Sequence, residues 1–152
     1  MAGYFVDSSA VAKLYHEELG TPRMQNLFTS AEARLYISRL GVVEVQSVFA
    51  GKVRAGAIAA SDAERLRYRF LGDLRNRSLR VVALAARHFQ EAENLIRRHG
   101  TSFRLKTLDA LQLAVALDLR GRGLVEQFVA SDRTLCEAAE QAGLTVLNPE
   151  SQ

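Results

Sequence analysis

The sequence predicts an α/β fold in which a mostly parallel sheet is covered by helices on both faces. Short apolar runs, typical of buried strands, alternate with segments whose apolar residues recur every three to four positions, as on one face of a helix. Parallel neighbours need a crossover connection, which is usually helical. The chain has 152 residues, 48% of them hydrophobic and 24% charged, which fits a single globular domain spanning residues 1–152.

The first third of the chain contains two expected strands and two expected helices. Residues 2–6 form an apolar run, and residues 10–15 follow it with helical spacing of their apolar members. Pro22 indicates the start of a second helix over residues 22–29, because proline is tolerated at the first helical position. Residues 34–38 alternate as expected of a second strand.

The middle of the chain is expected to contain two long helices, a strand and a further helix. Apolar residues recur at helical spacing over residues 40–60, and Ser61 followed by Glu64 has the spacing of a capping box that opens the next helix. Residues 79–84 have the composition of a third strand. A helix over residues 85–98 comes next.

The last third is expected to contain a buried helix and then a strand, a helix and a strand. Residues 108–119 are almost entirely apolar, which predicts a helix buried on most of its surface. Residues 125–131 and 144–147 have strand patterns, and residues 134–141 between them form a helix that Gly143 can end.

Two aspartates directly follow predicted strands. Ligands of parallel sheets bind outside the carboxyl ends of the strands, which is where Asp7 and Asp132 are expected. Either residue could instead cap the helix that follows it. For Asp132 the cap is already available from Thr134 and Glu137, which have capping-box spacing, so Asp132 is expected to be free for another role.

Two further acids lie on predicted helices among apolar residues. No cation stands three or four positions from Glu44, so burying its carboxylate would be costly without a positive partner; a solvent-facing glutamate is the alternative. Asp109 lies near a helix start, where the helix dipole would stabilise it, and its neighbours are apolar apart from Lys106. Asp118 stands four residues before Arg122, as in an ordinary surface ion pair, and is left out of the site.

These four acids have the chemistry needed to cut a phosphodiester bond. Carboxylate oxygens suit Mg²⁺ or Mn²⁺, and gathered like charges require a cation, a proton or strong hydrogen bonds to be tolerated. The ion would lower the pKa of a bound water and neutralise charge that grows on the phosphate. The expected catalytic and metal-binding residues are Asp7, Glu44, Asp109 and Asp132.

Composition and net charge indicate less about the function than the four acids do. The net charge of +3 is compatible with an RNA partner without demanding one, and Arg104 and Lys106, just before Asp109, are candidate phosphate contacts, with a solvated surface as the alternative. The single Cys136 excludes an internal disulfide and is expected to be a small buried residue. No apolar stretch approaches the roughly 20 residues of a membrane span and no signal-peptide pattern is present, so a soluble cytoplasmic protein is expected.

Four segments of the chain, taken in order, carry a family resemblance. They are Val6-Asp7-Ser8-Ser9-Ala10-Val11, the mid-chain helix with Glu44, Leu108-Asp109-Ala110-Leu111-Gln112-Leu113-Ala114, and Val129-Ala130-Ser131-Asp132-Arg133. Together they resemble the PIN-domain family and, among its members, the VapC toxins of bacterial and archaeal toxin–antitoxin pairs. The resemblance spans nearly the whole chain, and the segment with Asp109 is its most specific part.

The resemblance implies an α/β/α sandwich and an endoribonuclease that depends on Mg²⁺ or Mn²⁺. It further implies a homodimer that is inhibited by a VapB-like antitoxin. It assigns the four acids to catalysis and metal binding, with Ser9 as a hydrogen-bonding helper. Many relatives carry threonine two residues before the last acid, where this chain has Ala130, so Ser131 is the candidate for supplying the hydroxyl.

One other function fits part of the sequence, and a second fits poorly. A PIN-fold module with little or no nuclease activity would bind a partner through the apolar helix pair around Val45 to Ile58. A phosphatase with an aspartyl nucleophile usually needs a second aspartate two residues after the first, and Ser9 stands at that position.

Overall fold

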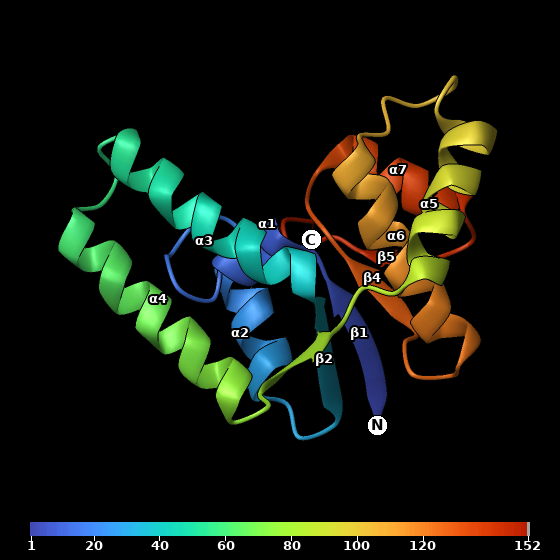
Figure 1. The fold of residues 1–152 in the computed structure, drawn as a ribbon. Helices are drawn as coiled ribbons and strands as arrows, with labels where there is room; N and C mark the ends of the chain where they lie inside the picture. The colour runs from blue at the N-terminus through green and yellow to red at the C-terminus, as the bar shows by residue number, and fades with distance from the viewer. Residues whose placement is uncertain (152) are drawn as a thin grey trace.

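The computed structural model describes residues 1–151 and contains a five-stranded sheet between two layers of helices (Figure 1). All paired strands run parallel, in the order β3-β2-β1-β4-β5. The strands are β1 (Ala2–Val6), β2 (Ala33–Ser38), β3 (Leu79–Val82), β4 (Gln127–Val129) and β5 (Thr145–Leu147). The predicted α/β/α sandwich is therefore confirmed.

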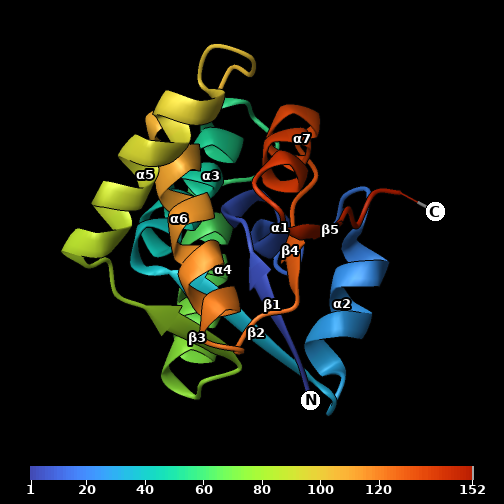
Figure 2. The ribbon, with the colours of Figure 1, turned by 90° about the vertical axis from the view of Figure 1, so that its right-hand side faces the viewer.

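Each connection between consecutive strands is helical, as parallel pairing requires. The helices are α1 (Ser8–Ala12), α2 (Thr21–Thr29), α3 (Arg39–Arg54), α4 (Ala60–Arg75), α5 (Ala86–His99), α6 (Thr107–Gly121) and α7 (Arg133–Gln141). The first four helices cover one face of the sheet and the last three cover the other (Figures 1 and 2). None of the helices in the described part of the chain combines the length and apolar composition of a bilayer-spanning segment.

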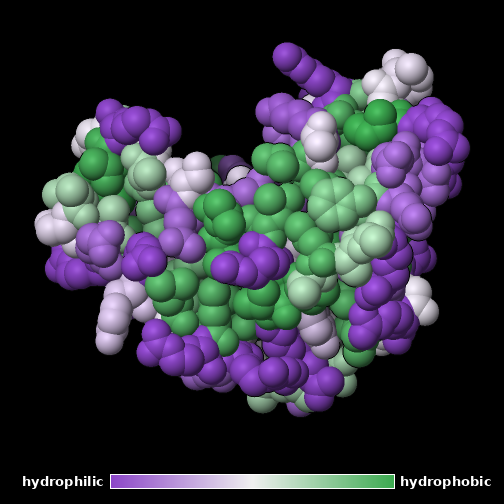
Figure 3. Space-filling model, viewed as in Figure 1, coloured by the Kyte–Doolittle hydropathy of each residue, from purple (hydrophilic) through white to green (hydrophobic). Residues whose placement is uncertain are grey.

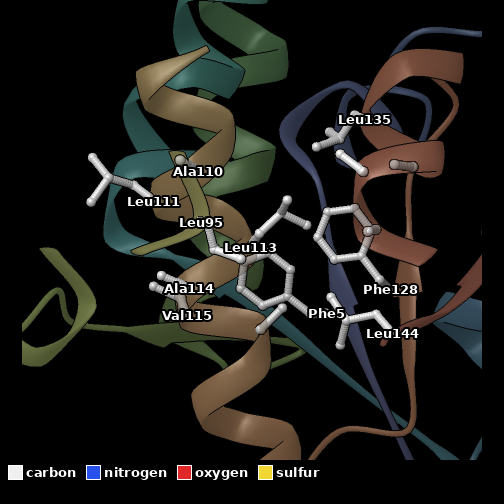
Figure 4. Packing of buried hydrophobic residues seen from close by; sticks show 14 of the residues in the cluster. Phe5, Leu95, Ala110, Leu111, Leu113, Ala114, Val115, Phe128, Leu135 and Leu144 are labelled. Carbon is white, nitrogen blue, oxygen red and sulfur yellow. The ribbon is translucent and has the colours of Figure 1, made fainter. Parts of the chain in front are cut away.

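Alternation along the strands divides the core between the two faces. Phe5 of β1 packs on the side of α5 to α7, and its neighbour Val6 packs on the side of α1 to α4. The Phe5 ring stacks on that of Phe128 from β4, with 5.7 Å between centroids and 10° between planes (Figure 4). On the opposite face three rings meet edge to face, those of Tyr15, Phe49 and Phe70. Apolar packing on both faces thus fixes β1 in the middle of the sheet.

Two strands are shorter than predicted because pairing, and not composition, sets their ends. The strand predicted over residues 79–84 ends at Val82, whose partner is Ser38, the last residue of β2. The strand predicted over residues 125–131 is confined to β4, which pairs with only three residues of β1 and three of β5.

The residues predicted to cap the start of α4 are wrong. The residue preceding the helix is Ala59, and its backbone N–H donates to the carboxylate of Asp62 at 3.1 Å. The pair Ser61 and Glu64, predicted as a capping box, lies inside the helix. The negative charge of Asp62 in the first turn satisfies an otherwise unpaired N–H group.

A buried histidine ties α5 to α6. His88 is 1% exposed; its Nδ1 accepts from the Ala85 backbone N–H at 2.9 Å and its Nε2 lies 2.8 Å from a carboxylate oxygen of Asp118. Because Nδ1 accepts, Nε2 is the nitrogen that donates. Asp118 also pairs with Arg87 at 3.1 Å and with Arg122 at 3.7 Å, so the predicted Arg122 pair is confirmed.

The segment after β5 is held against the first two helices. Arg23 of α2 donates from Nη1 to the carbonyl oxygens of Asn148 at 3.2 Å and Ser151 at 2.8 Å. Lys13, which is 5% exposed, pairs with Glu150 at 3.4 Å. These contacts fix residues 148–151 on the face formed by α1 to α4.

The apolar side of the α3–α4 pair faces the core. Val45 is fully buried and Phe49 is 2% exposed, so the partner-binding surface predicted around Val45 to Ile58 is wrong for these side chains. Large exposed apolar residues lie on α3 and α4 at Val43 and Tyr68, and also on the edge strand β3 and on α5, at Val81, Phe89 and Ile96. Figure 3 shows a hydrophobic band across this side of the molecule.

Candidate active site

Asp7 and Asp132 lie at the ends of two adjacent strands in the middle of the sheet. Val6 pairs with Val129, and the backbone N–H of Asp7 donates to the Val129 carbonyl at 2.9 Å, one residue beyond the end of β1. The chain proceeds from β1 through β2 to β3 on one side and to β4 and β5 on the other. The carboxyl ends of β1 and β4 therefore form the switch point at which open α/β sheets bind ligands.

Glu44 and Asp109 come from helices that flank this switch point. The helix α3 begins directly after β2, which places Glu44 in its second turn, and Asp109 lies in the first turn of α6. The molecular surface is hollowed between α3 and α6 (Figures 1 and 3). Asp7 is 6% exposed, Glu44 and Asp109 are half-buried, and Asp132 is exposed.

The acids act on one another electrostatically. Burial raises the pKa of Asp7 to about 7, and the negative charges of Glu44 and Asp109 also raise it. Hydrogen bonds from the backbone of Ser9 and Ser8 lower it in part. Burial also raises the pKa of Glu44, and Asp109 raises it further. Asp109 has a raised pKa because of burial and of Asp132, with the positive charge of Lys106 opposing both. The four predicted acids thus form one connected cluster of negative charge.

The cluster is open in its geometry. Within residues 1–151, no three His, Cys, Asp or Glu side chains lie close enough together to hold one metal ion among them. Mg²⁺ commonly takes only one or two carboxylates and completes its shell with water, so the open arrangement fits such an ion. The donor chemistry fits as well, because all four groups offer hard carboxylate oxygens.

The four acids form no ion pairs in the described part of the chain. The ion pairs formed within residues 1–151 do not include Asp7, Glu44, Asp109 or Asp132. Lys106 influences Asp109 from a longer distance. Uncompensated, partly buried carboxylates favour a bound cation, since burying charge without a partner is costly.

Asp7 and Asp132 also cap helices. A carboxylate oxygen of Asp7 accepts from the backbone N–H of Ser9 at 3.4 Å, and Oδ1 of Asp132 accepts from that of Leu135 at 2.8 Å. The prediction that Thr134 and Glu137 cap α7 is therefore wrong, because the chain enters the helix at Asp132. Each cap occupies one carboxylate oxygen, so capping and metal binding are compatible in these residues.

Three polar residues around Glu44 were absent from the predicted site. The Nε2 group of Gln112 donates to Glu44 Oε1 at 2.5 Å, and Gln112 Oε1 accepts from the hydroxyl of Ser38 at 2.7 Å. Ser8 is also buried, and a hydrogen bond from its hydroxyl lowers the pKa of Glu44, as the one from Gln112 does. The only signal in the sequence is that Gln112 is polar within an otherwise apolar helix, one turn after Asp109.

The two serines predicted as helpers are placed differently from each other. Ser9 is exposed and its backbone, not its hydroxyl, contacts Asp7. The Oγ atom of Ser131 is buried and has no hydrogen-bond partner in the described structure, next to Asp132 in the chain. An unpaired buried hydroxyl is costly, so Ser131 offers a free polar group at the edge of the site.

Cys136 of α7 lies beside the acids without the character of a metal ligand. Burial, together with the charges of Asp132, Glu140 and Asp7, raises the pKa of its thiol to about 11. The thiol donates to the Ala130 carbonyl at 3.2 Å. Cys136 was predicted to be a small buried residue, and in the structure it is only half-buried. A raised thiol pKa disfavours the reactive thiolate.

Arg104 and Lys106, the predicted RNA contacts, are both exposed in the segment that leads into α6. Lys106 is the residue that precedes the helix, three positions before Asp109. The connection between α5 and α6 projects from the same end of the molecule as the start of α6 (Figure 1). Both side chains are thus available to a polyanion that approaches the acids.

Comparison with known proteins identifies the family. Residues 4–141 match the PIN domain family, which is most of the chain. The chain belongs to the PIN-domain family. PIN domains are generally nucleases. No curated protein sequence matches the chain.

Solved structures of other proteins share this fold. One is VapC20 from Mycobacterium tuberculosis, described as a sarcin–ricin loop cleaving toxin, with 20% identity, a TM-score of 0.66 and 98% of each chain covered. Another is a toxin–antitoxin complex from Klebsiella pneumoniae, with 16% identity, a TM-score of 0.63 and 96% of this chain and 97% of that chain covered. A third is VapBC2 from Rickettsia felis, bound to a DNA fragment from its promoter, with 13% identity, a TM-score of 0.63 and coverage of 96% and 98%. At these identities the likeness establishes the fold.

Proposed function

We propose that this PIN domain is an endoribonuclease that depends on Mg²⁺ or Mn²⁺ and is the toxin of a toxin–antitoxin pair. One observation carries the proposal: four acids from separate parts of the chain form a connected cluster of negative charge, and none of them forms an ion pair within residues 1–151. The cluster lies at the switch point of the sheet, where open α/β folds bind ligands.

Asp7, Glu44, Asp109 and Asp132 would hold the divalent cation. A bound cation supplies an activated water and neutralises negative charge on the phosphate. Asp7, the most buried of the four, provides a site with little competing solvent. Because its pKa is about 7 without metal, part of the Asp7 population is protonated at neutral pH and must release that proton when the cation binds.

The substrate class follows from charge and exposure. Arg104 and Lys106 are exposed, and the charge of Lys106 acts on Asp109. Both would contact the phosphate backbone, which requires cations and not a base sequence. The solved structure described as a toxin that cleaves the sarcin–ricin loop supports RNA as the substrate.

The protein partners are an antitoxin and a second copy of the chain. Similar structures are described as toxin–antitoxin complexes, which supports a VapB-like antitoxin for this chain. The homodimer implied by the sequence resemblance has a candidate surface in the exposed apolar residues of β3 and α5. An open edge strand with such residues is a common site of association.

The test of the proposed activity is hydrolysis of RNA by the purified protein and by Asp7→Asn. We expect cleavage with Mg²⁺ or Mn²⁺, loss of cleavage in EDTA, and a decrease of about 100-fold or more in Asp7→Asn, because the variant loses a ligand. Asp62→Asn is the matched control, since Asp62 is far from the cluster at the start of α4 and should leave cleavage unchanged. Equal cleavage by the protein and by Asp7→Asn would exclude the proposal.

A further inference from the structure

A series of hydrogen bonds joins Glu44 of α3 to Gln112 of α6 and, through it, to Ser38 at the end of β2. Its Oε1 atom accepts from Gln112 Nε2 at 2.5 Å, and the Oε1 atom of Gln112 accepts from Ser38 Oγ at 2.7 Å. Ser38 is the last residue of β2 and the cap of α3, the helix that carries Glu44. Gln112 therefore connects the start of α3, at Ser38, with Glu44 in the second turn of the same helix.

The direction of each hydrogen bond in this series is determined. Ser38 Oγ accepts from the backbone N–H of Gly41 at 2.9 Å, so its own proton is available for Gln112. The amide oxygen of Gln112 accepts that proton, which leaves its NH₂ group toward Glu44. The amide N–H donates and a carboxylate oxygen accepts, so the contact fixes the position of Glu44 Oε1.

Burial makes this arrangement costly to break. Gln112 is 1% exposed and Ser38 is fully buried, while the residues on either side of Gln112 in α6 belong to the apolar core. A buried amide is tolerated only when its polar atoms are paired, so the side chain has one favourable orientation.

We propose that Gln112 is a positioning residue that holds the Glu44 carboxylate in the acid cluster, with Ser38 fixing the orientation of the Gln112 amide. The proposal rests on the proposed function, in which Glu44 binds a divalent cation. Residues that hydrogen-bond to metal ligands orient them, and their loss weakens metal binding by 10- to 100-fold in other proteins. Gln112 touches neither RNA nor the ion in this role.

The experiment measures Mn²⁺ binding by calorimetry, without RNA, to the full chain and its variants. Gln112→Met keeps the length of the side chain and removes the donor, and we expect it to weaken Mn²⁺ binding about 10- to 100-fold. Gln46→Met is the matched control, because Gln46 lies on α3 two residues from Glu44 but bonds to Arg67 and to its own helix. Gln46→Met should bind Mn²⁺ like the unmodified protein.

A double-mutant cycle separates positioning from a general loss of stability. If Gln112 acts through Glu44, Gln112→Met should weaken binding no further once Glu44→Gln is present. Mn²⁺ affinity in Gln112→Met equal to that of the unmodified protein would overturn the proposal, as would the same loss in both backgrounds. Unchanged Mn²⁺ binding by Glu44→Gln would instead contradict the proposed function, so the two failures are distinct.

Ser38→Ala provides a second variant in case Gln112→Met does not fold. It leaves the amide in place and removes the group that orients it, so we expect a smaller weakening of Mn²⁺ binding, about 3- to 10-fold. If folded Ser38→Ala binds Mn²⁺ as tightly as the unmodified protein, the role given to Ser38 is contradicted. If Gln112→Met also does not fold, the same result contradicts the whole proposal.

Discussion

Asp7 carries a cost that a bound cation would remove. Its side chain is 6% exposed, no Lys or Arg pairs with it within residues 1–151, and burial raises its pKa from 3.8 to about 7. A folded-state pKa above the unfolded value means that the folded protein loses stability as the pH rises from 3.8 to about 7. Without metal, the ionised Asp7 therefore destabilises the fold at neutral and higher pH.

We predict that Asp7→Asn stabilises the metal-free protein. Asparagine still caps α1 but carries no charge, so the variant should gain up to about 4 kcal/mol at pH 8 in EDTA. The gain should shrink as the pH falls below 7, where Asp7 of the unmodified protein becomes protonated. Urea unfolding at several pH values measures the gain in the free energy of unfolding of Asp7→Asn over the unmodified protein. A gain that is smaller at pH 8 than at pH 4 would contradict the prediction.

The places of the acids in the fold were predictable from sequence, whereas the residues that contact them were not. Asp7 and Asp132 follow strands, and Asp109 lies in a mostly apolar helix, as the local patterns indicated. The bonds from Gln112 to Glu44 and Ser38 join residues 68 and 74 positions apart. Periodicity gives the face of a helix on which a residue lies, but not which distant side chain it meets.

At the scale of elements, the joint between α5 and α6 depends on one carboxylate. Burial acts to raise the pKa of Asp118, but hydrogen bonds from His88 and Arg87 outweigh it and the pKa is lowered. A lowered folded-state pKa gives stability that is present above pH 3.8 and is lost as the pH falls through the folded pKa. Asp118 should therefore stabilise this helix pair at neutral pH.

We predict that Asp118→Ala destabilises the protein by about 1 to 3 kcal/mol at pH 7, because the buried Nε2–H of His88 loses its acceptor. The melting temperature should fall by roughly 2–4 °C for each kcal/mol lost. Differential scanning calorimetry measures the change. Glu126→Ala is the control, because Glu126 is exposed and forms no ion pair within residues 1–151. An equal effect of both variants would argue against the role of His88 and Asp118.

Helix starts were the least predictable elements. Both predicted capping boxes, at Ser61 with Glu64 and at Thr134 with Glu137, lie inside helices that begin earlier. Residue spacing identifies groups that can cap, but the position where the backbone leaves the preceding loop decides which of them does. The helix ends were clearer, since Gly143 follows α7 with φ of 95°, a conformation that favours glycine.

At the scale of the whole molecule, the parallel sheet followed from the alternation of strands and helices. The order of the strands did not, because periodicity does not say which strands are neighbours. That order makes β1 central, leaves β3 at an edge, and places Asp7 and Asp132 after two neighbouring strands. The site therefore depends on topology as much as on its residues.

The exposed edge at β3 and α5 leads to a prediction about association. If two copies meet there, Phe89→Glu should shift the protein from dimer to monomer, because Phe89 is 51% exposed on an apolar surface and a charge there would oppose burial. Light scattering after size exclusion gives the mass. Tyr68→Glu is the control on α4, where Tyr68 is 73% exposed, and monomers formed only by Tyr68→Glu would place the contact elsewhere.

The pairing of β1 with β4 also sets when the site can form during protein synthesis. The ribosome makes Asp7 among the first residues, whereas β4 and Asp132 come more than 110 positions later. Until then β1 lacks its second neighbour and the acid cluster lacks a member. A chain still in translation consequently has no complete site, and any activity toward RNA begins only once residue 132 has left the ribosome and folded.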